Sequence, residues 1–270
     1  MPNNAVPEFV FHAGTAPLLV SIPHMGTHIP PTIAAHMTPK AREMHDTDWH
    51  LDQLYACAFE LGASVLMATH SRYVVDLNRP ENGVSLYPGQ NVTGLCPLDS
   101  FDESSLYLSG NEPDASQIQQ RITQFWRPYH EQLASELHRL RELHGTAVLW
   151  DAHSIRSIVP RFFEGSLPNL NLGTADGKSC YPALAQKLLR LAQDIPDQTA
   201  VLNGRFKGGH ITRHYGNPAN RIHAIQLELT QCSYMQESMP FGYIHEQAQC
   251  LQPHLKKMLE ACITFAYSGE

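Results

Sequence analysis

The chain has 270 residues, of which 43% are hydrophobic and 17% are charged, and its formal net charge is −7. This composition excludes an intrinsically disordered chain, which combines few apolar residues with a high net charge. An integral membrane protein is excluded because no apolar run reaches the ~18 residues that cross a bilayer, and the mild acidity argues against a nucleic-acid-binding protein. We therefore expect a soluble globular protein, with no membrane and no nucleic acid as partner. Its one unusual feature is the presence of 16 histidines beside 19 lysines and arginines.

The pattern of apolar and helix-breaking residues predicts alternating strands and helices. Gly62 and Gly145 end two predicted helices, and Pro128 predicts a bend in the longest one. Residues 80–114 are rich in Pro, Gly, Asn and Ser, which predicts a loop that includes at most a short hairpin. The predicted elements are, in chain order, strand 18–22, helix 48–61, strands 63–69 and 73–77, helix 114–144, strand 147–150, helix 182–193, strands 200–202 and 224–229, and helix 242–266. Because they alternate without a linker or repeat, we expect a single α/β domain, residues 1–270, with a largely parallel sheet.

The cysteines indicate the compartment. They show no CxxC pair and no spacing typical of a zinc ribbon or a disulfide scaffold, and the N-terminal residues lack the pattern of a signal peptide. We therefore expect a cytoplasmic protein with reduced thiols. The six cysteines are Cys57, Cys96, Cys180, Cys232, Cys250 and Cys262.

Reactive side chains lie close to the ends of several predicted strands, where α/β proteins bind their ligands. His24 follows strand 18–22, and His153 lies in the turn after strand 147–150. Asp46 and Asp48 lie beside the start of a predicted helix, where an aspartate could equally be its N-cap. Glu228 lies between leucines in strand 224–229, and a carboxylate there is costly unless it is paired, bound to a metal or placed at the end of the strand.

Each of these positions alone is a weak signal, since a single histidine after a strand is more often structural. Together, two histidines after different strands and one aspartate match a catalytic zinc site, which has three protein ligands and an open position. A separate glutamate would then be the general base that activates water. This combination predicts hydrolysis at an acyl carbon.

The arginines suggest the class of substrate. Arg72 and Arg79 flank strand 73–77, and Arg213 lies in a glycine-containing cationic loop, residues 206–216, before the strand that carries Glu228. Guanidinium groups bind carboxylates in a bidentate manner, so two separated arginines could hold a small dicarboxylate. For any single arginine, an ordinary surface ion pair is the more common role.

Several longer motifs resemble the N-formylglutamate amidohydrolase family, also called N-formylglutamate deformylase, over roughly residues 15–265. The resemblance implies a three-layer α/β/α sandwich with a mixed, largely parallel sheet, similar to zinc carboxypeptidases and aspartoacylase. It also implies metal-dependent hydrolysis of N-formyl-L-glutamate to L-glutamate and formate, the last step of a histidine degradation pathway. The metal would be one divalent ion, with Zn²⁺ expected first. The motifs are SIPHMGTHIP, DTDWHLDQLY, SRYVVDLNRP, GLCP, WRPYH, LWDAHSIRSIVPRFFEG, LNGRFKGGHITRHYG and QLELTQ.

The resemblance also implies roles for individual residues. His24, Asp48 and His153 would hold the metal, with Asp46 as the alternative to Asp48, and Glu228 would be the general base.

The other implied roles concern the substrate. Asn78 and Arg79 would bind its α-carboxylate, Arg72 would stabilise the oxyanion, and Arg213 would bind the side-chain carboxylate.

Two other functions remain open at this point. The first is hydrolysis of another small N-acyl amino acid, because one methylene changes binding by only ~1–3 kcal/mol. The second is a metal- or ligand-binding protein without catalysis, which would have no use for Glu228. The native metal, the oligomeric state and a possible lid function of residues 80–114 also stay open.

Overall fold

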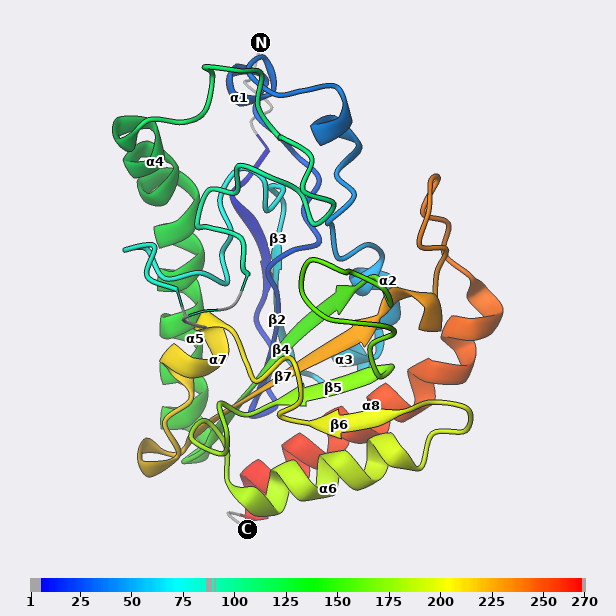
Figure 1. Ribbon diagram of the computed structural model, residues 1–270. Coiled ribbons are helices and arrows are strands. Elements are labelled where there is room, and N and C mark those ends of the chain that lie inside the picture. The colour runs from blue at the N-terminus through cyan, green and yellow to red at the C-terminus, as the bar shows by residue number, and fades with distance from the viewer. Residues whose placement is uncertain (1–5, 86–88, 90, 269–270) are drawn as a thin grey trace.

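A mixed seven-stranded sheet forms the centre of the computed structural model, which describes residues 6–85, 89 and 91–268 (Figure 1). The strand order is β1-β3-β2-β4-β7-β5-β6. The neighbouring pairs are parallel except β1 with β3 and β5 with β7. The predicted α/β class with a largely parallel sheet is therefore confirmed. The strands are β1 (Phe9–His12), β2 (Leu18–Ile22), β3 (Ser64–Ala68), β4 (Ala147–Ile155), β5 (Leu170–Gly173), β6 (Ala200–Leu202) and β7 (Ile222–Thr230).

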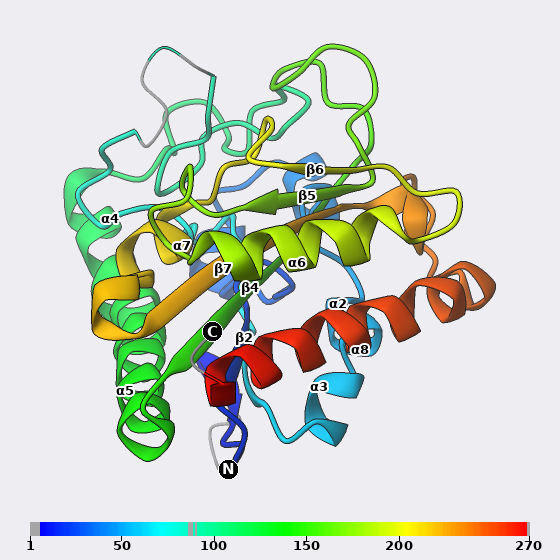
Figure 2. The same ribbon diagram turned by 90° about the horizontal axis from the view of Figure 1, so that it is seen from below.

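Helices cover both faces of this sheet. Helices α6 and α8 pack on one face and α5 on the other, which gives three layers (Figure 2). The α-helices are α1 (Pro31–Ala34), α2 (Leu51–Leu54), α3 (Cys57–Glu60), α4 (Ala115–Arg121), α5 (Arg127–His144), α6 (Pro182–Gln193), α7 (His210–Tyr215) and α8 (His245–Ser268). Shorter helical segments are the 3₁₀ helices η1 (Lys40–Glu43), η3 (Pro218–Asn220) and η4 (Gln231–Ser233) and the π-helix η2 (Ile122–Trp126). None of the helices in the described ranges is long and apolar enough to span a membrane.

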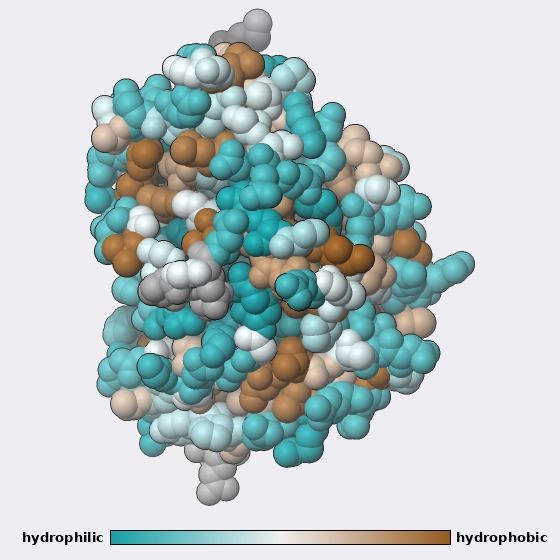
Figure 3. Space-filling model, viewed as in Figure 1, coloured by the Kyte–Doolittle hydropathy of each residue, from teal (hydrophilic) through white to brown (hydrophobic). Residues whose placement is uncertain are grey.

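The central strands are apolar on both sides because each face of the sheet is covered. Successive strand residues point to opposite faces, so Val20 packs in the core beneath α6 and α8 while Leu19 packs beneath α5. The outer surface is mixed: on the face in Figure 3, hydrophilic side chains surround scattered apolar ones.

Three predicted elements begin and end at the predicted residues. They are strands 18–22 and 200–202 and helix 182–193. The predicted helix 48–61 is instead two short helices, α2 and α3, and the predicted helix 242–266 is α8. Within 80–114, the described residues form no helix and no strand of the sheet, but Asp99 and Ser105 make an antiparallel bridge; residues 86–88 and 90 lie outside the described part.

The long helix predicted over 114–144 is continuous but changes its hydrogen-bonding pattern. Asp114 caps α4 by accepting a hydrogen bond from the Gln117 backbone, and Gly145 ends α5 with a positive φ. The interruption expected at Pro128 occurs as the π-helical segment η2 just before it, and Pro128 then lies in the first turn of α5, where its missing N–H costs little.

Two strand predictions need correction. Residues 73–77 are buried but form turns rather than a strand, and the Asp76 backbone N–H donates to the carbonyl of Leu95. Strand β4 continues from the predicted end at Trp150 to Ile155, because it pairs with β7 along its whole length. His153 therefore lies inside a strand and not in the turn after it.

Candidate functional site

Three side chains converge at the carboxyl ends of the central strands. His24 lies two residues after β2, His153 lies near the end of β4, and Asp48 lies just before α2. One ligand atom from each of the three lies within 4.8 Å of the others, and all three side chains are buried. Two backbone N–H groups hold the segments together: that of Asp48 donates to the carbonyl of His24, and that of Ser154 donates to Asp48 Oδ2.

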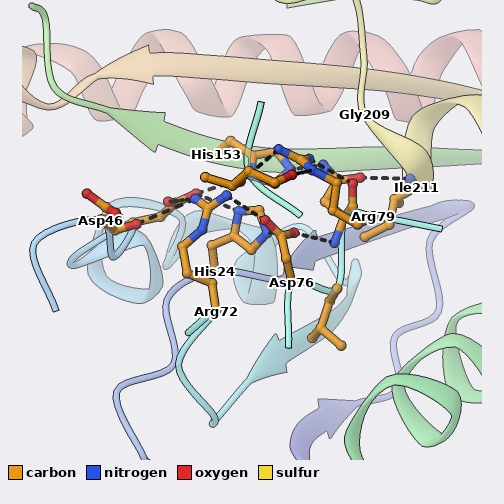
Figure 4. Close-up of polar contacts among 12 residues, drawn as sticks. His24, Asp46, Arg72, Asp76, Arg79, His153, Gly209 and Ile211 are labelled. Atoms are coloured by element: carbon orange, nitrogen blue, oxygen red, sulfur yellow. Dashed lines mark hydrogen bonds and ion pairs between the residues drawn. The ribbon is translucent and has the colours of Figure 1, made fainter. Parts of the chain in front are cut away.

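The imidazole rings present the same nitrogen to Asp48. Asp48 Oδ2 lies 3.1 Å from His153 Nδ1 and 3.6 Å from His24 Nδ1. On the opposite side of each ring, His24 Nε2 is 2.8 Å from Asp76 Oδ1 (Figure 4). His153 Nε2 is 3.1 Å from Asp151 Oδ1. For His24, the hydrogen bond of Nε2 with the Asp76 carboxylate fixes the proton there and leaves the Nδ1 lone pair for a cation.

These residues fit a metal ion. Among the described residues, neither His24 Nδ1 nor Asp48 Oδ1 has a hydrogen-bond partner, although both atoms are buried. Buried polar atoms without a partner are rare and call for an explanation. Two imidazole nitrogens and a carboxylate oxygen are a donor set typical of catalytic zinc, with a further position open. The arrangement can therefore hold a divalent cation between His24, Asp48 and His153.

Asp46, the alternative ligand, lies elsewhere. Its Oδ2 accepts a hydrogen bond from the Phe101 backbone at 2.8 Å, and its Oδ1 lies 3.9 Å from Arg156 Nη2. The structure thus brings Asp48, rather than Asp46, to the two histidines.

Glu228 lies beside His153 on the adjoining strand. The register of β4 and β7 pairs His153 directly with Glu228, so both side chains emerge on the same face of the sheet. Burial raises the pKa of Glu228 to about 8, although the positive charge of His153 acts in the opposite direction. Gln226 Nε2 donates to Glu228 Oε2 at 3.1 Å. A carboxyl group with a pKa near neutrality is suited to accept a proton and to return it.

A cavity opens above this group. Three arginines and three phenylalanines line it together with two of the metal-ligand candidates and Glu228. The loop after β4 and the described parts of segment 69–114, residues 69–85 and 91–114, both contribute to it and lie on the same side of the molecule (Figure 2). The lining residues are His24, Arg72, Asn78, Arg79, Asn91, Val92, Phe101, His153, Ser154, Ile155, Phe162, Arg205, Phe206, Gly209, Gln226 and Glu228.

Arg72 links the cavity to the histidine network. Its Nη2 donates to Asp76 Oδ2 at 2.7 Å, and its Nη1 lies 3.6 Å from Asp48 Oδ1. Burial alone would raise the pKa of Asp76, but the charges of His24 and Arg72 hold it well below its usual range. Asp76 therefore stays ionised and can fix the proton of His24 Nε2.

Asn78 and Arg79 line the cavity and also support its walls. Asn78 Nδ2 lies 2.9 Å from His153 Nε2, and its Oδ1 accepts from the Ile211 backbone. A side chain at Gly209 would lie 2.4 Å from Asn78 Nδ2, so only glycine allows this approach. Arg79 donates from Nε to the carbonyl of Thr93 at 2.9 Å.

Arg213 is not placed at the cavity. Residues 210–215 form α7 instead of the expected loop, and Arg213 Nε donates to the carbonyl of Gly208 at 2.8 Å. Arg205, eight residues earlier in the motif LNGRFKGGHITRHYG, is among the residues that line the cavity.

Sequence reasoning missed Asp76, Asp151 and Arg205. The available signal for the two aspartates was a single acidic residue directly after an apolar run, in YVVD and in AVLWD. Their function depends on which imidazole nitrogen they face, and that is a property of the folded chain.

Comparisons with known proteins show which family the chain is similar to. The model of the family described as N-formylglutamate amidohydrolase matches residues 16–235. Proteins named N-formylglutamate deformylase from Pseudomonas putida and Pseudomonas aeruginosa are each 49% identical to this chain over 94% of its length, which corresponds to 95% and 96% of theirs.

Two solved structures share the fold. One is N-formylglutamate amidohydrolase from Ralstonia eutropha, with a TM-score of 0.85 at 23% identity, covering 98% of this chain and all of that one. The other is a gene product from Agrobacterium tumefaciens, with a TM-score of 0.72 at 17% identity, covering 96% of both chains. From the family model and the Pseudomonas relatives, we conclude that this chain belongs to the N-formylglutamate amidohydrolase family.

Proposed function

We propose that this chain hydrolyses N-formyl-L-glutamate to L-glutamate and formate, using a divalent metal ion, with Zn²⁺ as the metal. The single observation that carries this proposal is the pairing of Glu228, the proposed general base, with His153 of the His24–Asp48–His153 group. The names of the Pseudomonas relatives supply the substrate. We place the reaction at the end of histidine degradation, in the cytoplasm, a location that suits six free cysteines.

His24, Asp48 and His153 would hold the metal through their Nδ1 and carboxylate oxygen atoms. When bound, such a cation would polarise the formyl carbonyl and lower the pKa of an attacking water towards about 7. Asp76 would keep the His24 imidazole in the orientation that ligation needs, and Asn78 and Asp151 lie beside Nε2 of His153.

Glu228 moves the proton. Its carboxylate accepts a proton from water as the water oxygen bonds to the formyl carbon, and it returns that proton to the amide nitrogen as the C–N bond breaks. Its buried position makes this transfer productive, because a pKa near neutrality serves both steps. The products are formate and the free amine of glutamate.

The arginines are proposed to bind a carboxylate of the substrate and to stabilise the negative charge that develops on the oxyanion. Arg72 lies beside the histidine network and adds positive charge where the oxyanion develops. Arg79, with Asn78, is proposed to bind the α-carboxylate, since both line the cavity and Asn78 lies 2.9 Å from the His153 ring. A dianionic substrate needs such local positive charge because the chain as a whole has a net charge of −7.

The test is formate release from N-formyl-L-glutamate, measured beside acetate release from N-acetyl-L-glutamate. The proposal expects a higher kcat/KM for the formyl compound. Faster hydrolysis of the acetyl compound would favour another N-acyl amino acid amidohydrolase, and a protein that binds metal but hydrolyses neither would be non-catalytic.

Metal affinity is expected to rise with pH. Burial alone would lower the pKa of His153, but the charge of Asp151 and hydrogen bonds with Asp151 and Asp48 raise it well above its usual value. Without metal, the His153 ring is therefore protonated on both nitrogens at neutral pH. A cation that binds to the ring must displace one of these protons. We expect the apparent affinity for Zn²⁺ to increase about tenfold per pH unit between about pH 6 and 7.5. Chelator-competition titrations across this range measure the slope, and an affinity independent of pH would contradict it.

A further inference from the structure

One end of the cavity is closed by an aromatic ring that packs on Arg72. The guanidinium carbon of Arg72 lies 4.9 Å from the centre of the Phe101 ring, and both side chains are buried and line the cavity. At this distance the cation is attracted to the face of the ring. Phe101 therefore lies directly beside the arginine that is proposed to stabilise the oxyanion.

Asp46 holds both members of this pair. It lies beside Arg72 (Figure 4), and its backbone carbonyl accepts a hydrogen bond from Arg72 Nη1 at 3.5 Å. Its Oδ2 accepts a second hydrogen bond, from the backbone N–H of Phe101, at 2.8 Å. Because one residue binds both the arginine and the segment that carries the ring, the two groups are held in one arrangement.

The residues on either side of Phe101 are also held in place. The carbonyl of Ser100 accepts a hydrogen bond from Arg161 Nη1 at 2.6 Å, and Asp102 Oδ1 lies 2.5 Å from Arg156 Nη2. Both arginines belong to the loop after β4. The ring is therefore a fixed part of the cavity wall, because moving it would break contacts with a second segment of the chain.

The Phe101 ring is connected to the reacting centre through Arg72. Arg72 Nη1 lies 3.6 Å from Asp48 Oδ1, which belongs to the candidate metal site. Under the proposed function, the oxygen of the scissile amide faces Arg72, and the amide nitrogen receives its proton from Glu228. The third substituent of the acyl carbon is a hydrogen in a formyl group and a methyl in an acetyl group. It lies on the same carbon as the oxygen that faces Arg72, so the ring that covers Arg72 is placed to meet it.

Neighbouring apolar side chains extend this wall. The rings of Phe101 and Phe162 pack edge to face with their centres 4.9 Å apart, and Ile155 belongs to the same hydrophobic cluster. All three side chains line the cavity. Apolar side chains that pack closely accommodate an added methyl group only by shifting, which is unfavourable. A hydrogen at this position asks for no such shift.

We propose that Phe101 forms the wall against the acyl substituent and so limits the substrate to a formyl group. This inference rests on the proposed deformylase activity, and it names the side chain that selects the acyl group. One carbon more or less in an apolar pocket changes kcat/KM about 10- to 200-fold, so loss of the ring should have an effect of that size.

The experiment measures kcat/KM of the zinc-loaded enzyme for N-formyl-L-glutamate and for N-acetyl-L-glutamate, which differ only in the acyl substituent. Phe101→Ala should lower the ratio of the formyl value to the acetyl value at least about 30-fold, because the space left by the ring admits the methyl group. The matched control is Phe163→Ala, which removes the same atoms from the same hydrophobic cluster but from a side chain outside the cavity lining. It should keep the ratio within about threefold of the wild type, since the acyl wall is intact.

A second variant covers the case in which Phe101→Ala is poorly folded, as judged by its thermal midpoint and metal content. Phe101→Leu keeps an apolar side chain in the cluster but is shorter than the ring, so the ratio should fall about tenfold. A ring that only supports the fold would, when replaced, lower both kcat/KM values in the same proportion. An unchanged ratio in both Phe101 variants, or an equal fall of the ratio in Phe163→Ala, would overturn the role of Phe101. A wild type that hydrolyses neither compound would instead reject the deformylase activity itself.

Discussion

Replacing Glu228 with glutamine is expected to lower kcat for formate release about 1000-fold while metal content stays at the level of the wild type. The amide keeps the shape of the side chain and its neighbour Gln226, but it cannot accept a proton from water. Because Glu228 pairs with His153 in register and is not one of the three converging metal-ligand candidates, its loss should affect proton transfer and not ligation. Steady-state kinetics combined with elemental analysis of the purified variant separate the two effects.

Glu164 offers a control for this substitution. It is exposed in the loop after β4, close in sequence to Phe162 of the cavity, and does not line the cavity itself. Glu164→Gln should leave kcat within about twofold of the wild type, as expected for a surface substitution away from the site. If Glu228→Gln retains more than about a tenth of the wild-type kcat, Glu228 is not the general base.

Loss of a metal ligand is expected to have the second large effect. His24→Ala, His153→Ala and Asp48→Asn should each weaken Zn²⁺ binding by more than about 100-fold, the upper range for removing an outer partner of a ligand. Formate release should fall with the metal content. Competition with a chromophoric chelator measures the affinities on the folded variants.

Asp46→Asn is the matched control for Asp48→Asn. Asp46 is as buried as Asp48, but it accepts from the Phe101 backbone and does not face the histidines. We expect its substitution to change metal affinity less than about threefold, because no ligand or ligand partner is lost. Loss of metal in Asp46→Asn together with normal binding in Asp48→Asn would show that the site has been assigned to the wrong aspartate.

Much of the fold could be predicted because local patterns and tertiary packing agree in it. Strand 18–22 is an apolar run that is followed by a proline. Helix 182–193 begins at a proline and carries an apolar stripe. Residues 73–77 were predicted wrongly because YVV has a high strand propensity. In the folded chain, Asp76 must reach both His24 and Arg72, and its backbone follows turns that allow this.

The candidate site could be predicted only in part. The positions of His24 and His153 near strand ends were visible in the sequence, although β4 proved to extend past His153. That Arg205 lines the cavity and Arg213 does not was not visible, because both lie in the one motif LNGRFKGGHITRHYG. Arg213 lies in α7, which begins where the backbone N–H groups of His210 and Ile211 donate to Asn78.

The most direct measurement is formate release from N-formyl-L-glutamate by the wild type before and after removal of its metal. Dialysis against a strong chelator should abolish release, and one equivalent of Zn²⁺ per chain should restore it. A chain shown to be free of metal that still releases formate at the original rate would contradict the assignment of His24, Asp48 and His153 as the metal centre of a deformylase.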